Sequence, residues 1–376
     1  MSTRLVLVTI LAACGSSTAP THISSAEPPK LTIPPGIVEP GVVLIGDLHG
    51  TREIPTFVGD LVATVARERP VVLGLEIPPG DTPSFDGFLA SDGGTAARER
   101  LLADPWWRTE FQDGRRSAAM AELVEAMRAR RAAGAKIDVD RIDTFAASAE
   151  DRDRGMAHRV IELRKAHPDA VIVIYAGDLH TMRKGVPRMP GYTWMAMQLA
   201  AEGVAFVSLN PHYEDGSAWV CHGANAADCG PSLTAGKPGA RGIKLEPSPD
   251  GNYDGWFGLG PITASPPAAF PELAKDFDRK LAALRDGPDG VRLRARRAAE
   301  AQDYRACVTA YESIAAPTGN DAYNHGCCLA LLGAKDAAFE RLQFAIDHGF
   351  ADLAHASTDP DLTSLHDDPR WPPKPR

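Results

Sequence analysis

Short apolar runs alternate with longer amphipathic segments in the first two thirds of the chain. Five continuous runs rich in Val, Ile and Leu, typical of strands buried on both faces of a sheet, cover residues 42–45, 71–75, 137–142, 171–175 and 204–209. Apolar residues three or four positions apart predict helices at about residues 54–68, 116–133, 147–166 and 194–202. The alternation predicts an α/β fold, with a mainly parallel sheet and helices on both faces.

The expected topology also predicts where chemistry takes place. Right-handed crossovers place the carboxyl ends of parallel strands at one edge of the sheet. Open α/β folds bind their ligands at this edge. Residues that directly follow the apolar runs are therefore the first candidates for a functional site.

The C-terminal part has a different pattern. Residues 215–268 are rich in Gly and Pro and predict a loop-rich extension of the α/β domain. Beyond it, helices are expected at about residues 304–314, 320–332 and 335–348. The last two resemble a tetratricopeptide repeat, and about one and a half repeats are too few for a free-standing solenoid. We expect a small C-terminal α-helical tetratricopeptide-like unit that packs on the main domain or on a protein partner.

The N-terminus is typical of an exported protein. An apolar stretch from Leu5 to Ala13 precedes Cys14, and Leu11-Ala-Ala-Cys14 resembles the site at which a lipoprotein signal peptidase cuts. Cys14 is then the lipidation site, and the product is a membrane-anchored lipoprotein of the cell envelope, outside the cytoplasm. An ordinary secretory signal with an incidental cysteine is the alternative.

These patterns divide the chain into five segments. They are a signal peptide at 1–13, a Ser- and Pro-rich tether at 14–38, the α/β domain at 39–268, a helical linker at 269–300 and the helical tail at 301–376.

The charge of the chain argues against one class of partner. The formal net charge is −9 and no block of Lys or Arg is present. Binding to a phosphate backbone requires a basic surface. We therefore expect no nucleic-acid partner.

Five cysteines remain after Cys14. In an oxidising compartment, Cys221 and Cys229 are spaced to close a small loop with a disulfide. A metal knuckle that includes His222 is a weaker alternative, because it lacks a fourth ligand. The other three cysteines, at positions 307, 327 and 328, lie in helical patterns and are expected to pack as small hydrophobic residues.

The same tetrapeptide follows two of the predicted strands. Gly46-Asp-Leu-His49 ends the first strand, and Gly177-Asp-Leu-His180 ends the fourth. Glycine at these positions allows the backbone to turn without a Cβ clash, which leaves the Asp and His at the sheet edge. Glu76 ends the second strand and Asp143 the third, so both reach the same edge.

Two imidazoles and several carboxylates can bind a divalent cation, or they can poise a water molecule or substrate oxygen for general acid/base chemistry. A lone strand-terminal histidine is more often a hydrogen-bonded packing residue. Two in matching turns favour a functional site. The two Asp residues of the turns also have a structural interpretation, as helix caps or braces of the turn.

Taken together, these motifs resemble those of the erythromycin esterase, ChaN and Tiki superfamily over residues 40–210. The resemblance rests on Gly46–Glu53, Glu76, Arg152-Asp153-x-x-Met-Ala, Gly177–Pro187 and the intervening segment Trp107–Ser117. It implies a site built from His49, Glu53, Glu76, Arg152 and His180.

The resemblance implies a ChaN-like exported lipoprotein as the leading hypothesis and a hydrolase as the alternative. ChaN-like relatives are lipoproteins that bind haem for iron uptake, and Tyr175, Tyr192 and Tyr213 are the candidate haem ligands. Esterase- and Tiki-like relatives are hydrolases of ester or peptide bonds. In that case Glu76 or Glu53 is a general base or metal ligand, Arg152 stabilises an anion, and the histidines carry protons or bind metal.

The expected partner is accordingly haem or a small-molecule ligand, and the expected cofactor is haem or a divalent metal held by His49, Glu76 and His180. The third alternative is an envelope scaffold that acts through its helical tail.

Overall fold

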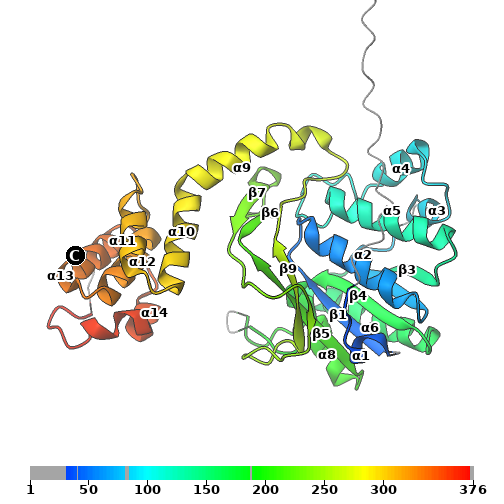
Figure 1. Ribbon diagram of the computed structural model, residues 1–376, viewed down its shortest axis with the longest axis horizontal. Coiled ribbons are helices and arrows are strands. Elements are labelled where there is room, and N and C mark those ends of the chain that lie inside the picture. Colours follow the sequence, from blue (N-terminus) through cyan, green and yellow to red (C-terminus); the bar gives the residue numbers. More distant parts are fainter. Residues whose placement is uncertain (1–30, 40, 81–83, 187–188, 373–376) are drawn as a thin grey trace, which may run out of the picture. The chain divides into compact units, whose positions relative to one another are not determined.

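The computed structural model describes residues 31–39, 41–80, 84–186 and 189–372 (Figure 1). The expected signal peptide, the lipidation site Cys14 and most of the expected tether lie outside the described residues. Within the described ranges, no helix is long and apolar enough to cross a membrane.

A mainly parallel sheet forms the centre of the α/β domain, as the sequence predicts. In the described part of the chain it has seven strands, in the order β3-β2-β4-β1-β5-β9-β8, and all neighbours are parallel except the last pair. The strands are β1 (Gly41–Asp47), β2 (Val71–Leu75), β3 (Ile137–Arg141), β4 (Val171–Gly177), β5 (Phe206–Glu214), β8 (Gly242–Lys244) and β9 (Gly255–Pro261).

Both faces of the sheet are covered, because successive residues of each strand point to opposite sides. Val43 and Ile45 belong to one hydrophobic core, and Val42 and Leu44 belong to the other. Helices α2 (Glu53–Val65) and α5 (Ala118–Ala132) complete the first core, and α6 (Ala149–Ala166) and α8 (Met195–Ala201) complete the second (Figure 1). This two-sided burial explains why the strands are continuously apolar in the sequence.

The chain forms several elements that the hydrophobic pattern did not predict. Helices α3 (Ser84–Leu89) and α4 (Thr95–Leu102) precede α5. The expected loop-rich extension contains a hairpin of β6 (Gly216–Cys221) and β7 (Cys229–Thr234), and it adds β8 and β9 to the sheet. In these strands glycine permits close backbone approach: a Cβ on Gly258 would lie 2.0 Å from the carbonyl oxygen of Ala240.

The α/β domain also begins earlier than expected. The sequence predicts a tether up to residue 38. In the structure, however, α1 (Pro35–Val38) lies within this segment, and its Ile37 is fully buried in the first core. Leu31 and Ile33 pack against the same core. Three apolar side chains spaced over so short a segment did not stand out as a periodic pattern.

Two disulfides are present among the described cysteines. Cys221 and Cys229 are paired and join the two strands of the hairpin. Cys307 and Cys328 are also paired, which corrects the expectation that they only pack as small hydrophobic residues. The pairing joins two different helices, so sequence spacing gave no indication of it. Cys327 is a buried free thiol.

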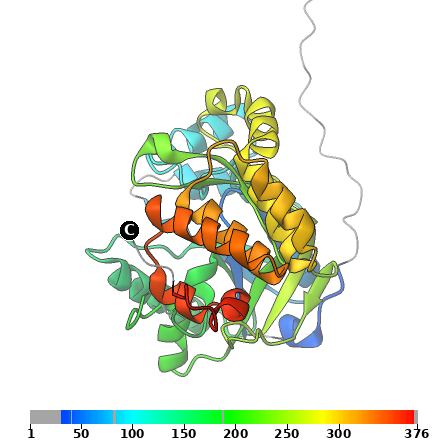
Figure 2. The same ribbon diagram turned by 90° about the vertical axis from the view of Figure 1, so that its left-hand side faces the viewer.

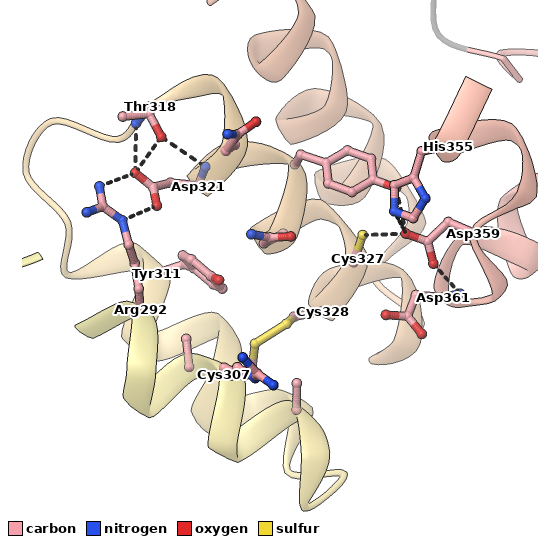
Figure 3. Close-up of a pocket in the computed structure, with 16 residues that line it drawn as sticks. Arg292, Cys307, Tyr311, Thr318, Asp321, Cys327, Cys328, His355, Asp359 and Asp361 are labelled. Atoms are coloured by element: carbon pink, nitrogen blue, oxygen red, sulfur yellow. Dashed lines mark hydrogen bonds and ion pairs between the residues drawn. A yellow bond between two sulfur atoms is a disulfide. The ribbon is translucent and has the colours of Figure 1, made fainter. Parts of the chain in front are cut away.

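The C-terminal segment is helical, as expected, and Figure 2 presents its helices in yellow to red. They are α9 (Phe277–Asp286), α10 (Pro288–Glu300), α11 (Tyr304–Glu312), α12 (Gly319–Leu331), α13 (Lys335–Asp347) and α14 (Leu353–Thr358). Helices α10, α11, α12 and α14, together with the segment after α14, line a pocket of about 640 Å³ (Figure 3). The tetratricopeptide-like interpretation of these helices stays a prediction.

Gly74 in the centre of β2 offers a test of the second core. A Cβ on Gly74 would lie 2.7 Å from Cδ1 of Ile174 and 2.8 Å from Cγ2 of Ile142. We expect Gly74→Ala to lower the free energy of unfolding by about 1–3 kcal/mol through overpacking, measured by urea denaturation. Gly87→Ala in α3 is the matched control, because no described atom lies within 4 Å of its added Cβ. Equal stability of Gly74→Ala and the wild type would contradict this packing.

Candidate functional site

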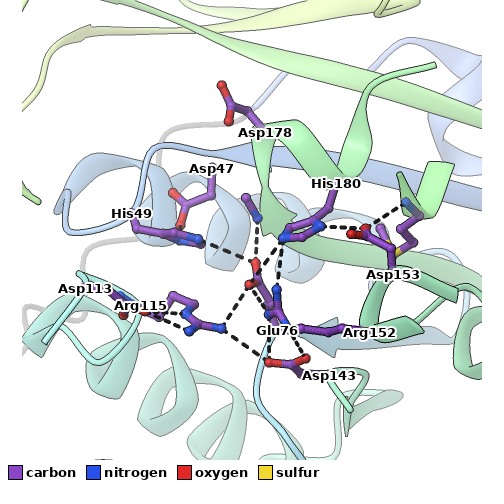
Figure 4. A network of polar contacts seen from close by, with 12 residues as sticks. Asp47, His49, Glu76, Asp113, Arg115, Asp143, Arg152, Asp153, Asp178 and His180 are labelled. Carbon is purple, nitrogen blue, oxygen red and sulfur yellow. Dashed lines mark hydrogen bonds and ion pairs between the residues drawn. The ribbon is translucent and has the colours of Figure 1, made fainter. Parts of the chain in front are cut away.

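The site lies at the carboxyl edge of the sheet, where three neighbouring strands end. Strand β4 lies between β2 and β1. Glu76 directly follows β2, His49 lies two residues beyond β1, and His180 lies in the short helix α7 (Asp178–Thr181) that follows β4. The parallel topology therefore brings together three residues that are far apart in the chain (Figure 4).

Glu76 is the centre of the network. Its side chain is only 3% exposed. Nε2 of His49 lies 3.5 Å from Oε2, and Nε2 of His180 lies 3.7 Å from Oε1. The main-chain amide of Gly177 donates a hydrogen bond of 2.7 Å to Oε2. One buried carboxylate thus lies between the two histidines.

Two arginines complete the surroundings of Glu76. Arg152 Nη2 donates to Oε1 at 2.5 Å, and Arg115 Nη1 donates to the same oxygen at 3.1 Å. Arg152 also binds Asp143 through Nε and Nη2, at 2.6 and 2.8 Å. Arg115 is held from its other side by Asp113, at 2.9 and 2.7 Å. Charge-assisted pairs of this kind fix the guanidinium groups in place.

The charges in this network shift the pKa values of its members. Burial raises the pKa of Glu76, but the neighbouring positive charges, that of His49 first, outweigh burial and hold the pKa well below its ordinary value. Burial likewise lowers the pKa of His49, and the carboxylates of Glu76 and Asp47 overcome this effect and raise the pKa to about 9. At neutral pH the pair is therefore a carboxylate and an imidazolium.

Each histidine is oriented by a second carboxylate. Nδ1 of His49 donates to Oδ2 of Asp47 at 2.6 Å. Nδ1 of His180 donates to Oδ1 of Asp153 at 2.6 Å. In both rings this hydrogen bond directs Nε2 toward Glu76, as Figure 4 shows.

Asp153 is fully buried, and several groups hold it in place. Besides His180, it accepts hydrogen bonds from the phenol of Tyr192 at 2.7 Å and from the main-chain amide of Met195 at 2.8 Å. Trp194 packs edge-on against the ring of His180, with 5.7 Å between ring centroids. His180 therefore has little freedom to rotate.

The contact between Arg152 and His180 determines the tautomer of His180. Nη1 of Arg152 lies 3.2 Å from Nε2 of His180. Because a guanidinium can only donate, Nε2 must be the acceptor, and the ring proton is on Nδ1, where Asp153 accepts it. The two histidines thus differ: His49 presents an N–H to Glu76, and His180 presents a lone pair.

The two matched tetrapeptides are not equivalent in three dimensions. Asp47 is the last residue of β1, and it binds the histidine two positions later. Asp178 starts helix α7, in which residues two positions apart point to opposite sides, so Asp178 is exposed and points away from Glu76 (Figure 4). The carboxylate that binds His180 comes instead from Asp153 of α6.

The glycines of the two tetrapeptides allow close packing rather than a chain reversal. Gly46 and Gly177 belong to β1 and β4. A Cβ on Gly177 would lie 3.0 Å from Nε2 of His49, and a Cβ on Gly46 would lie 3.1 Å from Oγ1 of Thr181. Glycine at these positions leaves the space that the histidine and helix α7 occupy.

Four of the five expected site residues meet in this network: His49, Glu76, Arg152 and His180. Glu53 is the exception, because its carboxylate accepts hydrogen bonds of 2.7 Å from both the amide and the hydroxyl of Thr263. Glu53 begins α2, and its side chain ties that helix to the segment after β9 rather than to the histidines.

The sequence did not mark three residues of the network, Asp113, Arg115 and Asp153, as site residues. Arg115 lies in the segment Trp107–Ser117, whose resemblance to family members was the only available signal. Asp153 follows Arg152 in an exposed-looking run of charged residues. Only the packing of α6 against α8 reveals that Asp153 is buried.

The donor set does not fit a divalent metal ion. His49, Glu76 and His180 are close together, but Arg115 and Arg152 occupy the positions around Oε1 of Glu76 that a cation would take. In the described ranges no group of three or more His, Cys, Asp or Glu is arranged to hold a metal. The two guanidinium groups therefore supply the positive charge beside Glu76 that a metal ion would otherwise provide.

Comparisons with known proteins give distant structural likenesses. A mutant of the erythromycin esterase EreC in its open conformation has a TM-score of 0.45 and 11% identity, over 62% of this chain and 93% of that chain. A protein from Bacillus cereus has a TM-score of 0.43 and 10% identity, over 62% and 91%. A succinoglycan biosynthesis protein has a TM-score of 0.40 and 12% identity, over 61% and 89%.

No family model matches the chain, and no curated protein matches it. At these TM-scores the structural likenesses carry no conclusion about family or function. The resemblance to the erythromycin esterase, ChaN and Tiki superfamily stays a prediction from the motifs.

The protonation of His49 is directly testable. We expect wild-type His49 to titrate with a pKa of about 9, and we expect Asp47→Asn to lower this pKa, because one of the two compensating carboxylates is lost. The measurement is an NMR titration of labelled imidazole rings. Glu53→Gln is the control and leaves the pKa of His49 unchanged. A wild-type pKa near the ordinary value of 6.5 would show that Glu76 and Asp47 do not outweigh burial.

The same shift predicts a pH dependence of stability. The folded-state pKa of His49 is raised, so protonated His49 stabilises the fold fully below about pH 6.5, and this contribution is lost as the pH rises through 9. Urea denaturation at several pH values should show a smaller loss over this interval for Asp47→Asn than for the wild type. Equal losses of stability in Asp47→Asn and the wild type would contradict the ion pair between His49 and Asp47.

Proposed function

We propose that the protein is a hydrolase that cleaves an ester bond, or a related peptide bond, with water at the site formed by His49, Glu76, Arg152 and His180. The observation that carries the proposal is the contact between Arg152 and Nε2 of His180. It leaves a lone pair on a rigidly oriented imidazole, directly beside a fixed cation.

His180 serves as the general base. Its Nε2 takes a proton from a water molecule as the water oxygen forms a bond to the carbonyl carbon of the substrate. The negative charge then develops on the former carbonyl oxygen. Nη1 of Arg152 stabilises this oxyanion, and the substrate oxygen competes with Nε2 for that N–H, which frees the nitrogen for the water proton.

His49 serves as the general acid. When the carbon–oxygen bond to the leaving group breaks, the alcohol oxygen takes the proton from Nε2 of the His49 imidazolium. One proton has then moved onto His180 and one has left His49, so proton exchange with solvent restores both. The side chains of His49 and His180 are 25% and 14% exposed, which supports access of water and substrate.

Glu76 has a different role from the one expected. Its low pKa keeps it a carboxylate and makes it a weak base. Its position between the histidines supports a positioning and electrostatic role, in which it maintains the proton on His49. Asp153 positions His180, and Asp47 positions His49.

Haem or iron uptake, as in ChaN-like lipoproteins, was the leading expectation from the sequence, and no specific observation favours it over hydrolysis. Tyr175 is buried and near Asp47, and both effects raise its pKa. Tyr192 donates its phenol to Asp153, and Tyr213 is partly buried. These candidate haem ligands are thus wholly or partly buried, or hydrogen-bonded to other groups of the protein, rather than free to bind haem iron. Scaffolding through the helical tail has no specific support either.

The test is hydrolysis of p-nitrophenyl acetate and of a peptide substrate by the purified chain. We expect His180→Ala to lower kcat/KM by roughly a hundredfold or more, since general-base catalysis contributes factors of this size. His158→Ala is the matched control, because His158 is an exposed histidine on the same helix that contributes Asp153. Thermal melting checks that both variants are folded.

Three outcomes count against the proposal. Equal turnover by His180→Ala and the wild type would remove His180 from the reaction. Loss of turnover on chelation, restored by a divalent ion, would replace this mechanism with the metal-dependent one. Stoichiometric haem binding without turnover would favour the uptake function instead.

A further inference from the structure

Two exposed phenylalanines lie on loops that also carry charged residues of the site. Phe145 is 80% exposed and lies two residues beyond Asp143. Phe111 is 36% exposed and lies two residues before Asp113. Two residues of chain span at most about 7 Å, so the backbone of each phenylalanine is close to a member of the network.

The loop that carries Phe145 is fixed to the network. The amide of Thr144 donates to Oδ1 of Asp143 at 2.7 Å, and the hydroxyl of Thr144 donates to the carbonyl oxygen of Arg152 at 3.4 Å. Gly155 allows this close approach, since a Cβ there would lie 2.5 Å from the hydroxyl oxygen of Thr144. Phe145 is therefore the residue next to an anchored position.

The loop that carries Phe111 is fixed as well. The next residue, Gln112, is buried, and its side-chain amide donates to the carbonyl oxygens of Trp107 and Thr109, at 3.2 and 2.5 Å. The carbonyl oxygen of Gln112 accepts a hydrogen bond of 2.9 Å from the indole of Trp219. The backbone that presents Phe111 is thus held on both sides.

Arg115 joins the two loops. Its Nη2 donates to Asp113 at 2.7 Å, and its Nη1 donates to Asp143 at 3.3 Å and to Glu76 at 3.1 Å. The two phenylalanines therefore belong to segments connected through a guanidinium that contacts the centre of the site. Single exposed apolar residues are common on protein surfaces, but here two lie on loops that also carry members of one charged network.

We propose that Phe111 and Phe145 determine specificity by binding the apolar acyl group of an ester substrate, in an inference that rests on the proposed hydrolase function. The charged network can accommodate the polar carbonyl but not a hydrocarbon chain, whose burial is favourable only against apolar surface. The substrate class is an ester of an apolar carboxylic acid, such as a medium-length acyl chain.

The experiment compares kcat/KM of the full chain for p-nitrophenyl acetate and p-nitrophenyl decanoate. We expect the wild type to prefer the decanoate, and we expect the Phe111→Ala/Phe145→Ala double variant to reduce this preference roughly tenfold, mainly through KM. Leu332→Ala is the matched control, because Leu332 is an exposed large apolar residue at the end of α12. This variant should keep the wild-type preference.

The outcomes separate the two proposals. Hydrolysis of both esters with no chain-length preference, or a preference that survives in the double variant, overturns the specificity inference and leaves the hydrolase function standing. Absence of turnover with every ester overturns both. A loss of preference equal in Leu332→Ala and in the double variant also overturns the inference, because it shows a general effect of surface hydrophobicity.

Discussion

The buried carboxylate of Glu76 requires compensation, and the arrangement of the site follows from how that compensation is supplied. Removing an ion from water costs several kcal/mol unless paired charges and hydrogen bonds replace the lost hydration. At Glu76 the replacement comes from Arg115, Arg152, His49 and the amide of Gly177. These groups belong to different loops, helices and strands. The charge is therefore satisfied only when the whole carboxyl edge of the sheet has assembled.

The same carboxylate makes two similar histidines chemically different. His49 lies beside Glu76 and Asp47, and the two anions keep it protonated. His180 accepts a hydrogen bond from Arg152, so its Nε2 has a lone pair instead of a proton. An acid and a base at one site, each oriented by its own carboxylate, form the combination that hydrolysis of an acyl compound needs. This difference arises from the partners of the histidines, because the three residues that precede each of them in the sequence are the same.

Rigid support surrounds the reacting groups. Asp153 is fully buried and accepts hydrogen bonds from three groups, so the ring of His180 is held in one orientation. Gly177 has no side chain, and this leaves the space that His49 fills. Preorganisation of this kind lowers the reorganisation that a reaction requires. The exposed Phe111 and Phe145 differ from this charged interior and lie on the loops that carry Asp113 and Asp143.

The sequence by itself determined the α/β alternation, because strands buried on both faces of a parallel sheet are continuously apolar. The ends of these apolar runs also determined the sheet edge at which β1, β2 and β4 present His49, Glu76 and His180. The motif resemblance added Arg152. Only the tertiary structure decided the partners: Asp153 for His180, Arg115 for Glu76, and Thr263 instead of the site for Glu53. The tertiary structure also decided the addition of strands β8 and β9 to the sheet and the formation of the Cys307–Cys328 disulfide. The physical reason is that hydrophobic periodicity reports local burial, whereas these contacts join residues far apart in the chain whose proximity depends on how helices and strands pack.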